Sequence, residues 1–393
     1  MNNFTFHVPT EIIFGRGTEA KVAEAVKHHG GRRVFIVYGG GSVKKSGLLE
    51  RVEKTLEEAG LPYAEFGGVK PNPLMSKARE GVHEAAKFGA DLILAVGGGS
   101  VIDTAKAIAH GAANLDTDIA EFWAKKKPVT RSLPIGVVLT ISAAGSETSD
   151  SAVLTNDETG KKGGINIEFN RPAFAIMDPE LTYTLPRKQL AAGIADIMMH
   201  TIDRYFTHET GNNLTDRVAE ALLKNVIKFG KIAMSNHKDY EAMSEIMWSG
   251  SVSHCGFTSL GRTMDFGVHK LAHELSARYD ATHGETLTTM WGSWARYMYQ
   301  DAPERFAEYA TNVWGVTVGT PEERSRAGIR LTEEYWQSLG LPLSFTELGI
   351  GVKDDDEIEY LADKLTDGGK TTVGAFHKID KPTAIAIYSM ANH

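Results

Sequence analysis

The sequence predicts two regions of different fold class, an α/β region built on a parallel sheet followed by an all-helical region. In the first half, short apolar, β-branched runs alternate with segments of helical periodicity, the usual pattern of a parallel sheet with helices on both faces. From Arg187 onward nearly every segment has helical periodicity and β-branched runs become scarce. We therefore expect a boundary near residue 186 and two domains, residues 1–186 and residues 187–393.

The elements of the first half follow from these patterns. Apolar residues alternate around Pro9 in Phe4–Phe14, which indicates an extended edge strand. Two strand patterns each run into a glycine turn and then a helix. The expected helices cover residues 18–29, 43–59 and 74–88 and a segment ending at Ala109, and the expected strands cover residues 33–38, 91–96, 135–139, 152–155 and 173–177.

In the second half, breaks between helices are expected where glycine, asparagine or proline interrupts the periodicity. These places are residues 211–213, Gly230, residues 340–342 and residues 367–369. The acidic run at residues 354–357 is expected at a helix N-terminus, where carboxylates interact favourably with the helix dipole.

The composition is that of a globular protein, with 42% hydrophobic and 23% charged residues among 393. A net charge of −8 argues against nucleic acid as a partner but leaves phosphate-bearing small molecules open. The single cysteine, Cys255, excludes an intramolecular disulfide and a zinc site built from cysteines. With no signal-peptide pattern and no apolar run of membrane-spanning length, we expect a cytoplasmic protein that does not enter a membrane.

Both glycine turns have the same form, three glycines and a serine directly after a strand. Such a turn lets backbone N–H groups approach a phosphate, and the N-terminus of the following helix adds partial positive charge. Neither fits GxGxxG, and one such turn alone is most often only a tight connection, but two together favour a nucleotide. The turns are Gly39-Gly40-Gly41-Ser42 and Gly97-Gly98-Gly99-Ser100.

The first turn also bears on which nucleotide is bound. Sites that select NAD commonly hold the ribose 2′-hydroxyl with a carboxylate, which would repel the 2′-phosphate of NADP. The stretch from Tyr38 to Lys45 has no acid and two lysines. This favours NADP(H) over NAD(H), although Lys44 and Lys45 are also compatible with a solvated helix face.

Three histidines, His269, His273 and His283, fall within the stretch Gly267–Gly284. His269 and His273 are four apart and would share one face of a helix. An unbroken helix would separate His269 from His283 by about 21 Å, so both can bind one ion only if the chain reverses between them. Tyr279–Thr282, followed by Gly284, could supply that turn. The alternative is a surface helix with histidines on its polar side.

Upstream, Asp196 and His200 lie four apart in an apolar helical segment. A carboxylate among Ala, Ile and Met is costly to bury unless it is paired or bound to a cation. A salt bridge to Arg204 would satisfy it without a metal. Together with two of the downstream histidines, Asp196 and His200 make a set of three nitrogens and one oxygen that suits Zn²⁺ or Fe²⁺.

These motifs resemble the iron-containing (group III) alcohol dehydrogenase family, and more closely its NADP-dependent butanol dehydrogenase and broad-specificity aldehyde reductase branch. The resemblance covers nearly the whole chain and rests on the run GGGSVID at residues 97–103, on Asp196 with His200, and on the spacing of His269, His273 and His283-Gly284. It implies a Rossmann-like dinucleotide-binding domain and a helical metal-binding, catalytic domain, the architecture shared with dehydroquinate synthase.

The resemblance also assigns residues. It implies metal ligands at Asp196, His200, His269 and His283, and leaves His273 beside the nicotinamide as the candidate for proton relay. The pyrophosphate would lie on Gly97–Ser100 with Asp103 nearby, and Gly39–Ser42 follow the NADP form of the family. Further cofactor contacts are implied at Thr140 and Lys162, and the charge of the first turn adds Lys44 as a candidate contact. One departure is Ala144, where many relatives have a threonine whose hydroxyl contacts the cofactor.

The implied activity is reversible, metal-dependent reduction of a small aldehyde such as butanal to its primary alcohol by NADP(H). Two alternatives stay open. One is an NAD- and metal-dependent carbon–oxygen lyase of the dehydroquinate synthase type, although its phosphate-rich substrate would need more basic residues than Gly267–Gly284 holds. The other is a non-catalytic nucleotide-binding assembly protein. By resemblance we also expect a homodimer formed through the N-terminal strand, Phe4–Phe14.

Overall fold

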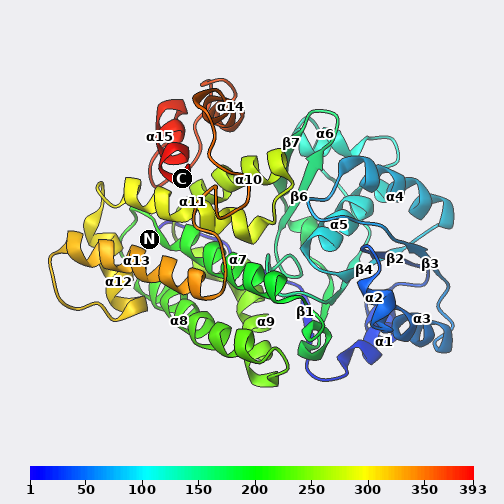
Figure 1. The fold of residues 1–393 in the computed structure, drawn as a ribbon. Helices are drawn as coiled ribbons and strands as arrows, with labels where there is room; N and C mark the ends of the chain where they lie inside the picture. The colour runs from blue at the N-terminus through cyan, green and yellow to red at the C-terminus, as the bar shows by residue number, and fades with distance from the viewer. The chain divides into compact units, whose positions relative to one another are not determined.

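The computed structural model describes residues 1–393, which divide into two compact units. The α/β unit comprises His7–Leu185, and the helical unit comprises Pro186–His393 together with Met1–Phe6 (Figure 1). The division falls beside the expected boundary at residue 186, but the first six residues belong with the helical unit. The assignment of separate roles to the two predicted domains stays a prediction. None of the helices is long and apolar enough to cross a membrane.

The α/β unit is built on a six-stranded sheet in which all neighbouring strands are parallel, as predicted. The strand order is β1-β8-β5-β4-β2-β3. The central strands are apolar along their whole length, because helices cover both faces of a parallel sheet. The strands are β1 (Glu11–Phe14), β2 (Val34–Tyr38), β3 (Tyr63–Phe66), β4 (Leu92–Gly97), β5 (Ile135–Leu139) and β8 (Phe174–Met177).

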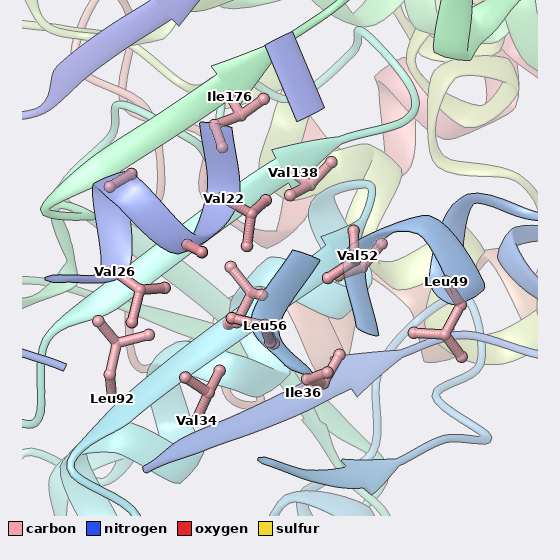
Figure 2. Close-up of a cluster of buried hydrophobic side chains, with 14 of the residues drawn as sticks. Val22, Val26, Val34, Ile36, Leu49, Val52, Leu56, Leu92, Val138 and Ile176 are labelled. Carbon is pink, nitrogen blue, oxygen red and sulfur yellow. The ribbon is translucent and has the colours of Figure 1, made fainter. Parts of the chain in front are cut away.

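The hydrophobic core of this unit lies against the sheet (Figure 2). On one face, buried side chains of α1 (Val22–His28) and α3 (Leu48–Glu58) pack against alternate residues of the strands, among them Ile36 and Leu94. A separate cluster joins α4 (Met75–Phe88), α5 (Gly99–Ala113) and α6 (Ile119–Trp123) to the hairpin of β6 (Ser151–Asn156) and β7 (Lys161–Asn166).

Several details of the predicted elements were wrong. The helix expected over residues 43–59 is two helices, α2 (Ser42–Lys45) and α3, because the chain turns at Gly47 with a φ of 70°. The segment expected as a helix from residue 18 starts as a 3₁₀ turn, η1 (Thr18–Lys21). The strand expected at residues 152–155 exists as β6, but it pairs antiparallel with β7 outside the parallel sheet. Neither β3 nor β7 was predicted.

The order of the strands places the two glycine turns side by side. After β2 the chain moves outward to β3 and then returns to β4 on the other side of β2, so a topological switch point lies between β2 and β4. Ligands of open parallel sheets bind outside the carboxyl ends of the strands at such a point. The turn after β2 and the turn that joins β4 to α5 occupy these two strand ends.

The helical unit contains nine α-helices and confirms the all-helical prediction. It also contains η4 (Phe257–Ser259), while η2 (Glu168–Asn170) and η3 (Pro179–Thr182) belong to the α/β unit. The nine helices are α7 (Arg187–Tyr205), α8 (Asn213–Ser235), α9 (Tyr240–His254), α10 (Gly267–Tyr279), α11 (His283–Met298), α12 (Pro303–Trp314), α13 (Pro321–Ser338), α14 (Asp355–Thr366) and α15 (Lys381–Ala391).

Three of the four expected breaks in this half are confirmed, and so is the helix start at the acidic run. The backbone N–H of Glu357 donates to the side chain of Asp354, which caps α14. The break expected at Gly230 was wrong, since α8 continues through it. A Cβ at this position would overlap the Tyr335 hydroxyl, so Gly230 permits close helix packing instead of ending a helix.

Candidate metal centre and nucleotide cavity

The chain reversal expected between His269 and His283 is present. Helix α10 ends at Tyr279, Asp280 adopts a left-handed conformation with a φ of 51°, and α11 starts at His283. Aspartate is one of the few non-glycine residues that tolerates this conformation. The reversal brings the ring centres of His269 and His283 to 5.4 Å from each other.

Three histidines of the helical unit surround one carboxylate oxygen, Oδ1 of Asp196. The Nε2 atoms of His200, His269 and His283 lie 3.4, 3.8 and 3.8 Å from Oδ1 of Asp196. These spacings are longer than hydrogen bonds. They are close to the edge of a tetrahedron whose centre binds each atom at about 2.1 Å, which is about 3.4 Å. The ligand atoms of Asp196, His200 and His269 all lie within 4.8 Å of one another, which is close enough to share one divalent cation, and His283 adjoins this group through Asp196.

Burial and charge at this cluster, the metal centre, agree with that fit. Oδ1 of Asp196 and Nε2 of His269 are buried and have no hydrogen-bond partner. Burial, together with the neighbouring His254 and His269, lowers the pKa of His200 well below its ordinary value. Burial also opposes protonation of His269, but the carboxylates of Asp196 and Asp203 raise its pKa overall. A cation would take the place of that proton.

Two supporting residues of the metal centre were missed from the sequence. Oδ2 of Asp203 lies 2.5 Å from Nδ1 of His269, which turns Nε2 toward Asp196. Asp203 follows Asp196 by seven positions on α7, so the helical repeat could have identified it. The ring of His254 stacks on that of His200 at 3.9 Å, and no pattern in the sequence points to this contact.

Gly284 explains how His283 reaches the centre. A Cβ at Gly284 would overlap the backbone carbonyl of Ala192 on α7, so only glycine lets the start of α11 lie against that helix. The close approach sets His283 beside Asp196 and His200, which α7 itself presents one turn apart.

His273 lies at the margin of the metal centre. Its ring centre is 5.3 Å from that of His283 and 6.4 Å from that of His269, and the residue is 9% exposed. Because it comes from α10 one turn after His269, it borders the cluster from the same helix face.

In the α/β unit, the first glycine turn forms one wall of a cavity of about 270 Å³, the nucleotide cavity. Gly41 has a φ of 120°, a conformation that favours glycine. Beside it, a Cβ at Gly98 of the second turn would overlap the Ile141 side chain. The cavity is lined by Tyr38, Gly39, Gly40, Gly41, Lys44, Gly67 and Gly68, while Ser42 begins α2 and Gly97, Gly99 and Ser100 lie at the junction of β4 and α5.

The other expected cofactor residues lie around the second turn or on the hairpin. The backbone N–H of Thr140 donates to the carbonyl of Gly97, which places Thr140 beside that turn. Lys162 of β7 donates to Oδ1 of Asn72 at 2.9 Å. Ala144, at the departure from the family pattern, lies 3.4 Å from the position of a Cβ on Gly99.

Asp103 is engaged in a buried network of its own unit. It accepts hydrogen bonds from the Ser146 hydroxyl at 2.6 Å and from the backbone N–H of Val153 at 2.9 Å. Asp103 also forms an ion pair with Lys106, which is fully buried. The ammonium of Lys106 donates hydrogen bonds to Ser146 Oγ and to the carbonyl of Ser151. These contacts hold the segment after β5 against α5.

One acidic residue beside the nucleotide cavity was also missed. Oε2 of Glu65 lies 3.0 Å from Nζ of Lys44 and accepts a hydrogen bond from the Tyr38 hydroxyl at 2.9 Å. The stretch from Tyr38 to Lys45 has no acid, but β3 supplies one from the neighbouring strand. The run Tyr63–Phe66 directly before Gly67-Gly68 is the signal that could have revealed it.

Both halves of the chain match models of one protein family. Residues 9–179 match a family model described as iron-containing alcohol dehydrogenase, and residues 190–392 match the C-terminal model of the same family. The chain is 39% identical to NADH-dependent butanol dehydrogenase A of Clostridium acetobutylicum, with 99% of each protein covered. It is 35% identical to an NADPH-dependent aldehyde reductase of Escherichia coli, with 100% of each covered.

Solved structures show the same fold. The crystal structure of NADH-dependent butanol dehydrogenase A from Thermotoga maritima superimposes with a TM-score of 0.95 at 34% identity, covering 100% of this chain and 99% of that one. A structure of the Escherichia coli protein gives a TM-score of 0.94, also at 34% identity, covering 100% of this chain and 99% of that one.

Proposed function

The chain belongs to the iron-containing alcohol dehydrogenase family, in its butanol dehydrogenase and aldehyde reductase branch, and from this premise we propose its chemistry in detail. It is an alcohol dehydrogenase and aldehyde reductase that uses a nicotinamide cofactor and a metal ion. We further propose that it interconverts small aldehydes and primary alcohols, butanal and butanol among them. We propose that it prefers NADP(H) over NAD(H). The proposed metal is Fe²⁺ or Zn²⁺, held by Asp196, His200, His269 and His283.

The observation that carries the proposal is the meeting of three imidazole nitrogens around one buried carboxylate oxygen. Three nitrogens and one oxygen suit either metal. When bound, a divalent ion supplies Lewis acidity toward a carbonyl oxygen, and the reduced nicotinamide supplies the hydride. The protein's part is to hold the four donors in place, with Asp203 orienting His269.

His273 is our candidate for moving the proton. Reduction of a carbonyl needs one proton at oxygen, and an imidazole can give and take a proton near neutral pH. His273 lies next to His283 without being one of the histidines whose Nε2 atoms surround Asp196 Oδ1.

The preference for NADP(H) is supported by Lys44 on the wall of the nucleotide cavity and by the absence of an acid within the turn itself. A cation there would attract the 2′-phosphate, and the turn's backbone groups can approach it. Relatives named for NADH and for NADPH are both similar to this chain, so kinetics with the two cofactors decide the matter.

The test is oxidation of NADPH by protein purified without chelator, with butanal as substrate. We expect oxidation that depends on butanal, stops when the metal is removed, returns with Fe²⁺ or Zn²⁺, and has a higher kcat/KM for NADPH than for NADH. Full oxidation of NADPH by metal-free protein would contradict the proposal. A lyase would keep its cofactor without net oxidation, and a non-catalytic protein would bind NADPH without consuming it.

We also propose that the protein works in the cytoplasm as a homodimer joined through its N-terminal strand. Strand β1 lies at the edge of the sheet and pairs only with β8, so its other side can add a strand from a second copy. Phe14 at its end is 38% exposed. Sedimentation of the wild type and of Ile12→Pro, which cannot donate at the edge, tests this: the dimer should weaken in the variant.

A further inference from the structure

A second layer of charge lies behind the wall of the nucleotide cavity. Tyr38 and Lys44 both line that cavity, and both contact the same oxygen, Oε2 of Glu65. The ammonium of Lys44 also lies 4.9 Å from the centre of the Tyr38 ring. Lys44 is therefore an exposed cation that is already paired with an acid on the neighbouring strand.

Of the two neighbouring carboxyl groups, Glu53 and Glu65, Glu65 ionises more readily. Burial and the charge of Glu65 raise the pKa of nearby Glu53, whereas the hydrogen bond from Lys44 lowers the pKa of Glu65. Hydrogen bonds with Tyr38 and Glu65 raise the pKa of Lys44. At neutral pH the wall of the cavity therefore presents one cation with one anion directly behind it.

We infer that Glu65 is a specificity-determining residue of the nucleotide site: by pairing with Lys44, it limits the preference of the cavity for a ribose 2′-phosphate over a 2′-hydroxyl. The inference rests on the proposed function, which places the nucleotide ribose at the first glycine turn. It predicts that the site discriminates less strongly between the two cofactors than the sequence of the turn alone indicates.

Two opposing effects of Glu65 have to be compared. Its carboxylate holds the long Lys44 side chain in place, which would help any ligand of that lysine. Lys44 and Glu65 keep 54% and 37% of their side-chain surface exposed, and an ion pair in that setting orders a lysine only weakly. Repulsion between a carboxylate and a phosphate dianion is screened by the same solvent, but it falls with inverse distance and needs no fixed side-chain geometry. Repulsion is therefore the larger effect, and neutralising Glu65 strengthens binding of the phosphate.

The experiment measures dissociation constants of NADP⁺ and NAD⁺ by calorimetry, so it does not depend on turnover. Glu65→Gln keeps the size of the side chain and its bond to Tyr38 but removes the charge. We expect the Kd of NADP⁺ to fall about tenfold and that of NAD⁺ to change less than about twofold, the size of one partly screened charge contact. Lys44→Met should weaken NADP⁺ selectively. The control is Glu84→Gln, the same change at an exposed position of α4.

Each outcome of the calorimetry either supports or overturns the inference about Glu65. A selective gain for NADP⁺ in Glu65→Gln, and none in Glu84→Gln, supports the inference. An unchanged ratio of the two constants overturns it, and so does weaker binding of NADP⁺, which would make Glu65 a residue that positions Lys44. In either case the proposed function stands, because both cofactors still bind. If the folded wild type binds neither cofactor, both the inference and the proposed nucleotide site fail.

Discussion

At the metal centre, Asp203 decides which nitrogen of His269 faces Asp196. We predict that Asp203→Asn lowers metal affinity about 10- to 100-fold, because the amide accepts the same hydrogen bond without the charge that strengthens the histidine as a ligand. Competition with a chromogenic chelator measures this. The control is Asp301→Asn, which changes the equivalent contact of His377 in an exposed pair of the same unit. Unchanged affinity in Asp203→Asn would show that Asp203 does not support the ligand.

A second prediction at this scale concerns pH. Burial lowers the pKa of Lys106 to about 8, while an unfolded lysine titrates near 10.5. Between these values the unfolded chain binds more protons than the folded one, so raising the pH removes the cost of a buried charge. Relative to Lys106→Met, the wild type should gain about 3 kcal/mol between pH 8 and pH 10.5. Chemical denaturation across that range measures the difference, and parallel curves for the two proteins would contradict it.

Residues of the site differ in how far the sequence alone could predict them. Asp196 and His200 stand out because a carboxylate and a histidine share one face of an apolar helix. The chain reversal before His283 follows from the reach of one metal ion. Glu65 did not stand out, because its strand was not predicted and its partner lies 21 positions away. Sequence spacing carries no information about contacts between strands whose pairing is unknown.

At the scale of elements, the packing of α11 against α7 sets the metal centre. We predict that Gly284→Ala destabilises the protein by about 1–3 kcal/mol and lowers its metal content, because the added methyl overlaps the Ala192 carbonyl and moves His283. Metal analysis and denaturation of the variant measure both effects. Gly163→Ala is the matched control, since a Cβ there meets nothing within 4 Å. Full metal content in Gly284→Ala would contradict this account of the glycine.

Helices and strands with a strong periodic pattern were predicted, and those set by tertiary contacts were not. Gly230 was expected to break a helix, yet α8 continues because the missing side chain makes room for Tyr335. Strand β7 has the sequence KKGGIN, which lacks the apolar pattern of a strand and forms one only through its pairing with β6. Propensity describes a segment alone, whereas these segments respond to a neighbour.

At the scale of the whole molecule, the fold class followed from the sequence and the strand order did not. Alternating strands and helices predict a parallel sheet, but many orders satisfy that pattern. The order β1-β8-β5-β4-β2-β3 makes β2 and β4 neighbours and so brings the two glycine turns together. The matching family models cover both the α/β and the helical part of the chain, consistent with a chemistry that requires nucleotide and metal in one protein.

Metal should stabilise the protein as well as activate it. The four proposed ligands come from α7, α10 and α11, so an ion bound by them would join three helices of the helical unit. At free metal about 100-fold above Kd, binding adds about 2.7 kcal/mol. We predict that a chelator lowers the unfolding temperature of the wild type but not that of His269→Ala. Equal shifts in the two proteins would mean that the metal acts elsewhere.

The central claim is that the histidines divide their work, with His269 and His283 holding the metal and His273 serving the reaction. The most direct test compares His283→Ala with His273→Ala, measuring bound metal and NADPH oxidation with butanal on the same samples. We predict that His283→Ala loses both metal and turnover, whereas His273→Ala keeps its metal and loses turnover. A His283→Ala protein that turns over at the wild-type rate without metal, or a His273→Ala protein that loses its metal, would contradict this assignment.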